Sequence, residues 1–211
     1  MHADLAHLQP VEAQLTGLDA CFFCMGVSAT GLAKTEYARL NYELPVAVAQ
    51  TLSRLSPGMT FCYVSGAGTD SSERGRIMWA RVKGRTENAL LRLPLNACMF
   101  RPGLIRPMDG IRSKTPAYRI FYSLAGPILP LLQKLLPRQI IDTRELGQAM
   151  LKMARRGRQG QLQERILEMK DIRALLSNAA AFASVAGDTD PAPFFWSWPG
   201  RRQVPARPVP W

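Results

Sequence analysis

The fold is predicted from one stretch of the chain, Thr60-Phe61-Cys62-Tyr63-Val64-Ser65-Gly66-Ala67-Gly68. Its first five residues are uncharged and rich in aromatic and β-branched side chains, which favours a buried strand. The two glycines after Ser65 indicate a tight turn at the end of that strand. Residues 76–91 then have the pattern of a helix, and residues 97–100 form a second apolar run, closed by Arg101-Pro102-Gly103.

A strand and a long helix are predicted upstream of this stretch. Residues 19–24 form a short apolar strand that ends at Met25-Gly26. Residues 33–55 form a helix with one apolar face, because leucine or valine recurs at every fourth position, at Leu40, Leu44, Val48 and Leu52. Pro45 lies inside this helix and predicts a kink or a break there.

Downstream, residues 145–154 have the pattern of another helix, for which Thr143 is the expected N-cap. A last short strand is predicted over 165–169 and a helix over 171–176. The alternation of strands and helices predicts an α/β fold, a parallel sheet with crossover helices. Ligands of such sheets bind at the carboxyl ends of the strands, which here are Gly26, Ser65 and Arg101-Pro102-Gly103.

Composition fits one globular domain. The chain has 211 residues, 47% of them hydrophobic, and a formal net charge of +11. A basic chain invites a nucleic-acid interpretation. However, the charge is spread out and no run of five basic residues occurs. A generally basic surface is therefore the preferred interpretation, and no specific nucleic-acid partner is predicted.

The four cysteines do not predict a metal site. Cys21 and Cys24 have CxxC spacing, but they lie in an apolar run that has the pattern of a strand. Residues three apart on a strand point to opposite faces, so the two sulfurs could not share an ion. Cys62 and Cys98 stand alone. Unpaired buried cysteines are typical of a reducing compartment, and we expect the cytoplasm.

Neither a signal peptide nor a membrane span is predicted. Residues 1–14 lack an apolar core, and the most hydrophobic segment, 120–136, is too short to span a bilayer and contains two prolines. Contact of 120–136 with a membrane surface is the less favoured alternative to a buried helix. Residues 177–211 differ in composition and predict a disordered tail after a domain of residues 1–176. Within this tail, residues 205–208 weakly resemble a polyproline ligand.

Several motifs resemble those of the atypical short-chain dehydrogenases/reductases. Tyr63-Val64-Ser65-Gly66-Ala67-Gly68-Thr69-Asp70 resembles their catalytic-serine strand, and 78–87 resembles the helix that carries YxxxK. Phe100-Arg101-Pro102-Gly103 resembles the turn beside the nicotinamide, and Cys24-Met25-Gly26 the loop beside the adenosine ribose. Asn41 falls at the family's structural asparagine. The bacterial Tat-interacting-protein-like subgroup, often labelled nucleoside-diphosphate-sugar epimerase-like, is the most similar, over about residues 1–176.

Two departures from the family pattern limit what the resemblance implies. The GxxGxxG turn that admits the pyrophosphate to a helix N-terminus is absent. The first βα units of the Rossmann-like fold are thus expected to be missing, with Asp4 at the position that contacts adenine. In addition, Trp79 stands where the family has its catalytic tyrosine, four residues before Lys83. An indole N–H donates but does not titrate usefully, so Trp79 cannot shuttle a proton.

The resemblance implies an NAD(P)-dependent oxidoreductase or epimerase-like protein. Its catalytic positions would be Ser65, Trp79 and Lys83, and its cofactor-binding residues Asp4, Gly26, Lys83, Arg101, Pro102 and Gly103. A small carbonyl compound or a nucleotide sugar would be the substrate. We expect NAD or NADP to bind weakly or not at all, because the phosphate-binding turn is absent. The alternative is a non-enzymatic module on the same scaffold, for NAD(P) sensing or protein interaction, which Trp79 favours.

Overall fold

Four parallel strands form the central sheet of the computed structural model, which describes residues 5, 7–108 and 139–177. They are β1 (Ala20–Phe23), β2 (Thr60–Val64), β3 (Asn96–Arg101) and β6 (Ile166–Glu168), in the spatial order β1-β2-β3-β6. The expected α/β fold with a parallel sheet and crossover helices is confirmed, and strand β2 has the predicted bounds. The described residues belong to one unit, Met1–Asn178.

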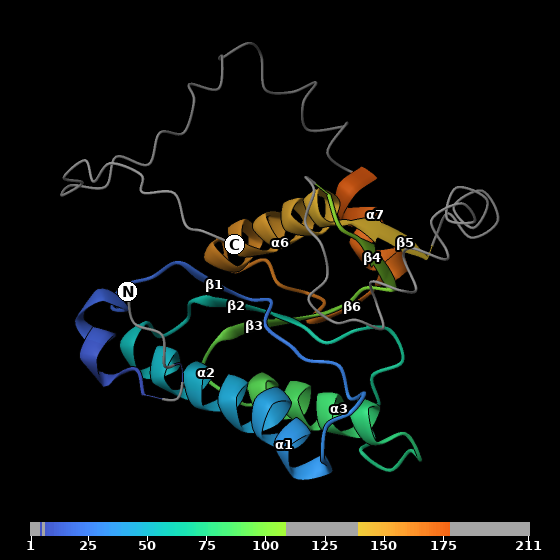
Figure 1. Ribbon diagram of the computed structural model, residues 1–211. Coiled ribbons are helices and arrows are strands. Elements are labelled where there is room, and N and C mark those ends of the chain that lie inside the picture. The colour runs from blue at the N-terminus through green and yellow to red at the C-terminus, as the bar shows by residue number, and fades with distance from the viewer. Residues whose placement is uncertain (1–4, 6, 109–138, 178–211) are drawn as a thin grey trace, which may run out of the picture. The chain divides into compact units, whose positions relative to one another are not determined.

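Helices cover both faces of this sheet (Figure 1). On one face lie α1 (Lys34–Ala38), a π-helical turn (Arg39–Glu43), α2 (Leu44–Leu55) and α3 (Met78–Leu91). On the other lie α6 (Thr143–Arg158) and α7 (Met169–Ser177). A second sheet pairs β4 (Leu104–Arg106) with β5 (Ile140–Asp142), also in parallel. Helices of both layers thus lie in the connections between parallel strands, which need crossovers of this kind.

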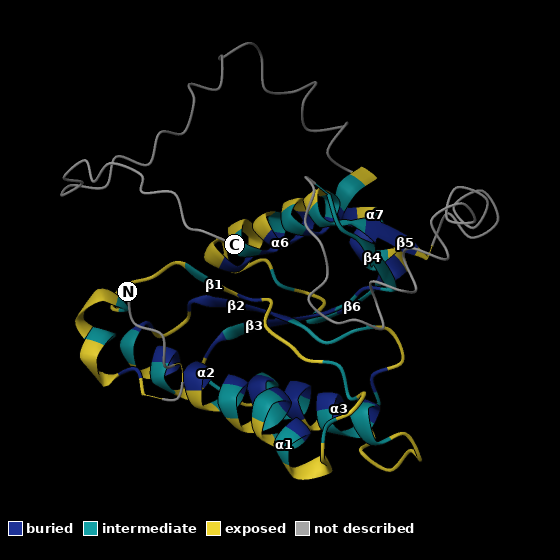
Figure 2. Ribbon diagram, in the orientation of Figure 1, coloured by how far each residue is buried: buried dark blue, intermediate teal, exposed yellow. Residues whose placement is uncertain are grey.

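The sheet separates two hydrophobic cores. Side chains of β2 and β3 alternate between them, because successive residues of a strand point to opposite faces. Phe61 and Tyr63 of β2 pack with α2 and α3, whereas Cys62, between them in sequence, packs with α6 and α7. Figure 2 shows the burial that results, with β2 dark between the two helical layers.

The structure corrects several details of the prediction. The helix expected over 33–55 is divided by the π-helical turn Arg39–Glu43, and Pro45 lies in the first turn of α2, where proline is tolerated. Asp142, not Thr143, caps α6: its side chain accepts from the Glu145 amide in a capping box. A 3₁₀-helix at Gln9–Gln14, β4 and β5 were not predicted, being too short to show a period.

No helix within the described residues is both long enough and apolar enough to cross a membrane. The expectations for Asp4, for residues 120–136 and for the tail beyond Ser177 concern residues outside the described part of the chain.

Candidate functional site

The predicted site loops do meet at the carboxyl edge of the sheet. Strands β2 and β3 end side by side, and the Ala67 amide donates to the Pro102 carbonyl at 2.8 Å. The Ser65 amide similarly donates to the Phe100 carbonyl at 2.9 Å. Gly26 follows the neighbouring strand β1. The loops that the sequence marked as ligand-binding are therefore adjacent, as the topology of a parallel sheet predicts.

Lys83, Asn41 and Gly26 form one corner of this edge. A Cβ atom placed on Gly26 would lie 3.2 Å from Lys83 Nζ and 3.6 Å from Asn41 Oδ1, so both polar atoms converge on the glycine. Lys83 is only 6% exposed. Its Nζ donates one long hydrogen bond, 3.4 Å to the Val64 carbonyl, and lies 5.0 Å from the centre of the Tyr63 ring.

This corner has unused hydrogen-bonding capacity. Asn41 Oδ1 is buried and accepts no hydrogen bond from the described residues. An ammonium has three donors, and Lys83 uses one of them on protein atoms within the described part. Burial lowers the pKa of Lys83 to about 8, and the Glu87 carboxylate opposes that shift. An oxygen that accepts from Lys83 and donates to Asn41, such as a hydroxyl group, would satisfy both.

The π-helical turn accounts for the position of Asn41. A π turn carries more residues than an α turn and disturbs the regular ladder of backbone hydrogen bonds. The Asn41 carbonyl accepts instead from two side chains, Thr86 Oγ1 at 2.7 Å and Tyr63 Oη at 3.3 Å. Its side-chain amide donates to the Tyr37 carbonyl at 3.2 Å. Helix α1 is thereby tied to α3 and β2, and Asn41 is held at the site.

Trp79 lies one helical turn before Lys83, at the start of α3. It is half-buried, and its ring packs against the β2 loop, where a Cβ on Gly68 would lie 3.6 Å from Trp79 Cη2. The position that resembles the family tyrosine therefore supplies an indole to the wall of the site. As its N–H can only donate, Trp79 gives the site no acid or base.

Ser65 is engaged in a buried polar network. Its hydroxyl lies 2.5 Å from Glu87 Oε1 and 3.1 Å from the Phe100 carbonyl. Glu87 is fully buried in α3 and accepts from Arg101 Nε at 3.0 Å and Arg101 Nη2 at 2.5 Å. This paired geometry is the strong, bidentate form of an arginine–carboxylate contact. Glu87 was missed in the sequence, although an acid one turn after Lys83 on the same helix face was the available signal.

The Arg101 side chain is occupied by protein atoms. Besides Glu87, it donates to Glu168 Oε1 at 2.9 Å and to Ser71 Oγ at 2.5 Å. The Glu87 pairing raises the pKa of Arg101 beyond its already high value. Arg101 therefore holds α3, β3 and β6 together, which is a different use from the cofactor contact that the sequence suggested for its turn.

Pro102 and Gly103 shape the same turn. Pro102 is buried and receives the Ala67 hydrogen bond described above. A Cβ on Gly103 would lie 2.3 Å from the Gln139 carbonyl, which accepts from the Leu104 amide at 3.0 Å. Glycine is needed at this position so that the chain can start the pairing of β4 with β5.

No metal site is formed within the described ranges, where no group of three His, Cys, Asp or Glu side chains converges. Cys21 packs against the core of α2 and α3, whereas Cys24 is exposed. Burial raises the pKa of the Cys21 thiol to about 12. Metals bind the thiolate, so this pair is poorly suited to an ion.

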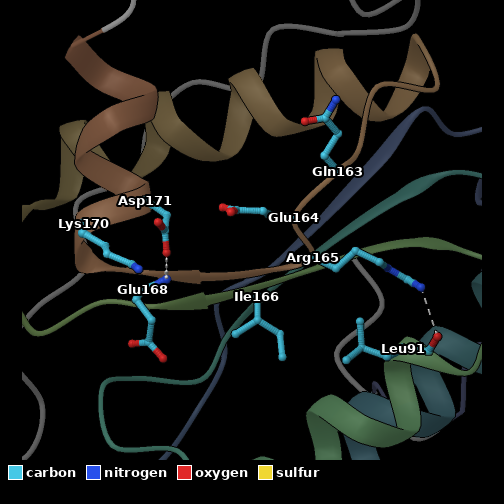
Figure 3. Close-up of a pocket in the computed structure, with 8 residues that line it drawn as sticks. All are labelled: Leu91, Gln163, Glu164, Arg165, Ile166, Glu168, Lys170 and Asp171. Atoms are coloured by element: carbon cyan, nitrogen blue, oxygen red, sulfur yellow. Dashed lines mark hydrogen bonds between the residues drawn. The ribbon is translucent and has the colours of Figure 1, made fainter.

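A groove of about 650 Å³ lies elsewhere, along β6 (Figure 3). Leu91 at the end of α3 and Ile166 form its apolar part, and Arg165 Nη1 donates to the Leu91 carbonyl at 3.3 Å. Glu168 lines it as well and connects it to Arg101. The groove contains none of the predicted site residues.

Comparison with known proteins is informative at the level of structure. No protein-family model matches the sequence, and no curated protein is significantly similar to it. Solved structures that match include three with TM-scores above 0.5. They are gox2253 (0.54, 14% identity), UDP-N-acetylglucosamine 4-epimerase from Bacillus cereus (0.52, 11%) and RMD from Pseudomonas aeruginosa complexed with NADPH (0.53, 16%). The chain shares a Rossmann-like α/β fold with these three proteins.

The matches cover 84%, 79% and 87% of this chain, respectively. The chain spans 60% of the length of gox2253, 63% of the epimerase and 73% of RMD. At these identities the likeness concerns the fold alone. Within this Rossmann-like fold, Ser65, Lys83 and Gly26 lie at the carboxyl edge of the sheet, and Asn41 and Glu87 contact them there.

Proposed function

We propose that this chain is an NAD(P)-binding protein of the oxidoreductase or epimerase type whose cofactor binding is weak and whose proton transfer is impaired. The observation that carries the proposal is the Lys83–Asn41 corner beside Gly26. There, within the described residues, the buried ammonium uses one of its three donors and the buried amide oxygen accepts no hydrogen bond, so a ribose hydroxyl could contact both. A vicinal diol can accept from the ammonium and donate to the amide oxygen at once. Bound NAD or NADP would supply hydride chemistry.

Weak binding follows from what the described residues do not provide. A dinucleotide needs backbone N–H groups and a helix N-terminus for its pyrophosphate, usually from a glycine-rich turn. Gly26, Lys83 and Asn41 fit the ribose, but no GxxGxxG turn occurs in the sequence. Arg101 cannot substitute for such a turn while it is held by Glu87, Glu168 and Ser71.

Impaired proton transfer follows from the two catalytic positions. Trp79 can donate a hydrogen bond but not a proton, and the Ser65 hydroxyl is already committed to the Glu87 network. The proposed substrate class is a small carbonyl compound or a nucleotide sugar. The proposed relationship is to the Tat-interacting-protein-like bacterial subgroup, and the proposed location is the cytoplasm.

Titration of the purified chain with NADPH, followed by its fluorescence, tests the proposal. We expect a dissociation constant well above the micromolar range, and further weakening in Lys83→Met. Lys170→Met is the control, because Lys170 is exposed on α7. Adenosine monophosphate should also bind better than its 2′,3′-dideoxy analogue. Binding in the low micromolar range, or equal binding by wild type and Lys83→Met, would contradict the proposal.

Trp79 also favours a second candidate, a non-enzymatic module for NAD(P) sensing or protein interaction. The discriminating measurement is NADPH oxidation with a panel of carbonyl compounds at cofactor concentrations that give binding. Binding without turnover supports the sensor, whereas turnover by the wild-type chain supports the enzyme and requires a proton donor other than Trp79.

A further inference from the structure

The direction of the hydrogen bond between Ser65 and Glu87 has a consequence for ligand choice. A serine hydroxyl carries one proton, and its two nearest polar atoms in the site, Glu87 Oε1 at 2.5 Å and the Phe100 carbonyl at 3.1 Å, are both acceptors in this arrangement. A separation of 2.5 Å is typical of a hydroxyl that donates to a charged carboxylate. The proton of Ser65 therefore points into the protein.

The alternative orientation is excluded by the remainder of the network. If the Ser65 proton pointed outward, Glu87 would have to donate to Ser65. Glu87 Oε1 and Oε2 each already accept an N–H from Arg101, and Arg101 is fixed in turn by Glu168 and Ser71. Two oxygens 2.5 Å apart without a proton between them would repel each other. Glu87 is fully buried, so solvent does not compete for these contacts.

We propose that Ser65 presents a hydrogen-bond acceptor to a ligand, so that the site selects alcohols over the corresponding carbonyl compounds, and that Glu87 is the positioning residue that sets this preference. The proposal rests on the proposed function only in requiring that small ligands bind beside Ser65, and it implies that a carbonyl substrate binds less tightly than the alcohol formed from it. A ketone oxygen can only accept, and it would face a lone pair of Ser65. An alcohol can donate to Ser65 and accept from a donor such as Trp79 or Lys83 at the same time.

A direct test observes the proton itself. In the NMR spectrum of the full chain, we expect a Ser65 hydroxyl proton that exchanges slowly with water and resonates downfield of free serine hydroxyls. Ser65→Ala should remove this signal, which assigns it. A wild-type Ser65 hydroxyl that exchanges as fast as an exposed serine would overturn the inferred orientation, whether or not any nucleotide binds.

A second test measures the preference with an isosteric pair, cyclohexanol and cyclohexanone. Their affinities are read from shifts of the Ser65 and Gly66 amide signals and of the Trp79 indole signal. We expect the alcohol to bind about fivefold or more tightly, as the gain or loss of one hydrogen bond implies. Ser65→Ala, which leaves Glu87 and Arg101 paired, should abolish the difference. Equal binding, a preference for the ketone, or no binding of either probe would overturn the selection.

Glu87→Gln tests the positioning role. The glutamine amide can donate to Ser65 Oγ, which would free the serine proton to point outward. We expect the preference to shift toward cyclohexanone while the slow hydroxyl signal is lost. An unchanged alcohol preference in a folded Glu87→Gln variant would show that Glu87 does not set it. If Glu87→Gln does not fold, Ser65→Ala and the hydroxyl signal still decide the proposal. The nucleotide titration described above can fail or succeed independently.

Discussion

At the scale of single residues, the most unusual charge is that of Lys83. An ammonium that is almost fully buried normally has a carboxylate partner. The nearest candidate, Glu87, is paired with Arg101 instead. Lys83 therefore bears a desolvation cost that the Val64 carbonyl and the Tyr63 ring offset only in part. Such a cost is tolerated at functional sites and has a measurable dependence on pH.

Lys83→Met should therefore stabilise the chain at neutral pH. The folded-state pKa of Lys83 is about 8, below the unfolded value of 10.5, so between these values the unfolded chain binds more protons. The wild type consequently gains stability relative to Lys83→Met as the pH rises from about 8 to 10.5. Below about pH 8 the wild type bears the full free-energy cost of burying the charged ammonium. We expect an advantage for Lys83→Met of up to about 3 kcal/mol at pH 7, measured by urea unfolding at several pH values. An advantage independent of pH would contradict the burial of a charged Lys83.

Trp79→Tyr should introduce the missing proton donor. Lys83 lies four residues later, on the same helix face, and its ammonium would stabilise a phenolate and lower the pKa of the new phenol. General acid–base catalysis contributes about 10²–10⁴-fold. We expect a comparable rise in NADPH-dependent carbonyl reduction at high cofactor concentration. Trp79→Phe is the control, since it has the ring without the hydroxyl. Equal activity of the two variants would mean that α3 does not place residue 79 at the reacting group.

At the scale of secondary-structure elements, the sequence predicted what depends on local pattern. Strand β2 could be assigned because it is a short uncharged run bounded by turn residues, and the range predicted for helix α3, residues 76–91, contains the whole helix. The π-helical turn could not, because it depends on contacts of Asn41 with residues from β2 and α3. The pairing of Arg101 with Glu87 and Glu168 likewise joins residues 14 and 67 positions apart. For the same reason, the hydrogen bond between the Ser65 hydroxyl and Glu87 was not predicted.

The close contact between the 70–75 loop and helix α3 gives a prediction at this scale. A Cβ at Gly84 would lie 1.8 Å from the Asp70 carbonyl oxygen, so the loop can contact the helix only at a glycine. We expect Gly84→Ala to destabilise the chain by at least about 1–3 kcal/mol. Gly147→Ala is the matched control, because nothing lies within 4 Å of its added methyl group in α6, and it should stabilise by up to about 1 kcal/mol. Thermal unfolding of both variants tests this, and similar effects would contradict the close contact.

At the scale of the whole molecule, β1 is the notable strand. Within the described residues it pairs only with β2, and from Ala20 to Ala33 the chain has no charged residue and no proline. Natural edge strands usually carry such residues to prevent association. Phe22 on this strand is 41% exposed. The edge of β1 is thus the part of the described surface where self-association is most expected.

Phe22→Lys should therefore reduce concentration-dependent association without lowering the melting temperature. Leu151→Lys is the matched control: Leu151 is 54% exposed, on α6, and the change removes one apolar side chain and adds one charge in the same way. Sedimentation velocity over a range of protein concentrations compares the three chains. An equal effect of both substitutions would show that net charge, not the β1 edge, governs association.

The parallel topology also affects how this chain emerges from a ribosome. Strand β3 pairs with β6 through Met99 and Ile166, which are 67 positions apart (166 minus 99). At a synthesis rate of about 5–20 residues per second, roughly 3–13 seconds pass between the synthesis of Met99 in β3 and that of its partner Ile166 in β6. For most of that interval Cys98 and Phe100 lack α6, and they lack α7 until β6 has been made; both helices later cover them. Chaperones that bind apolar segments should therefore engage this nascent chain mainly between the completion of β3 and that of α7.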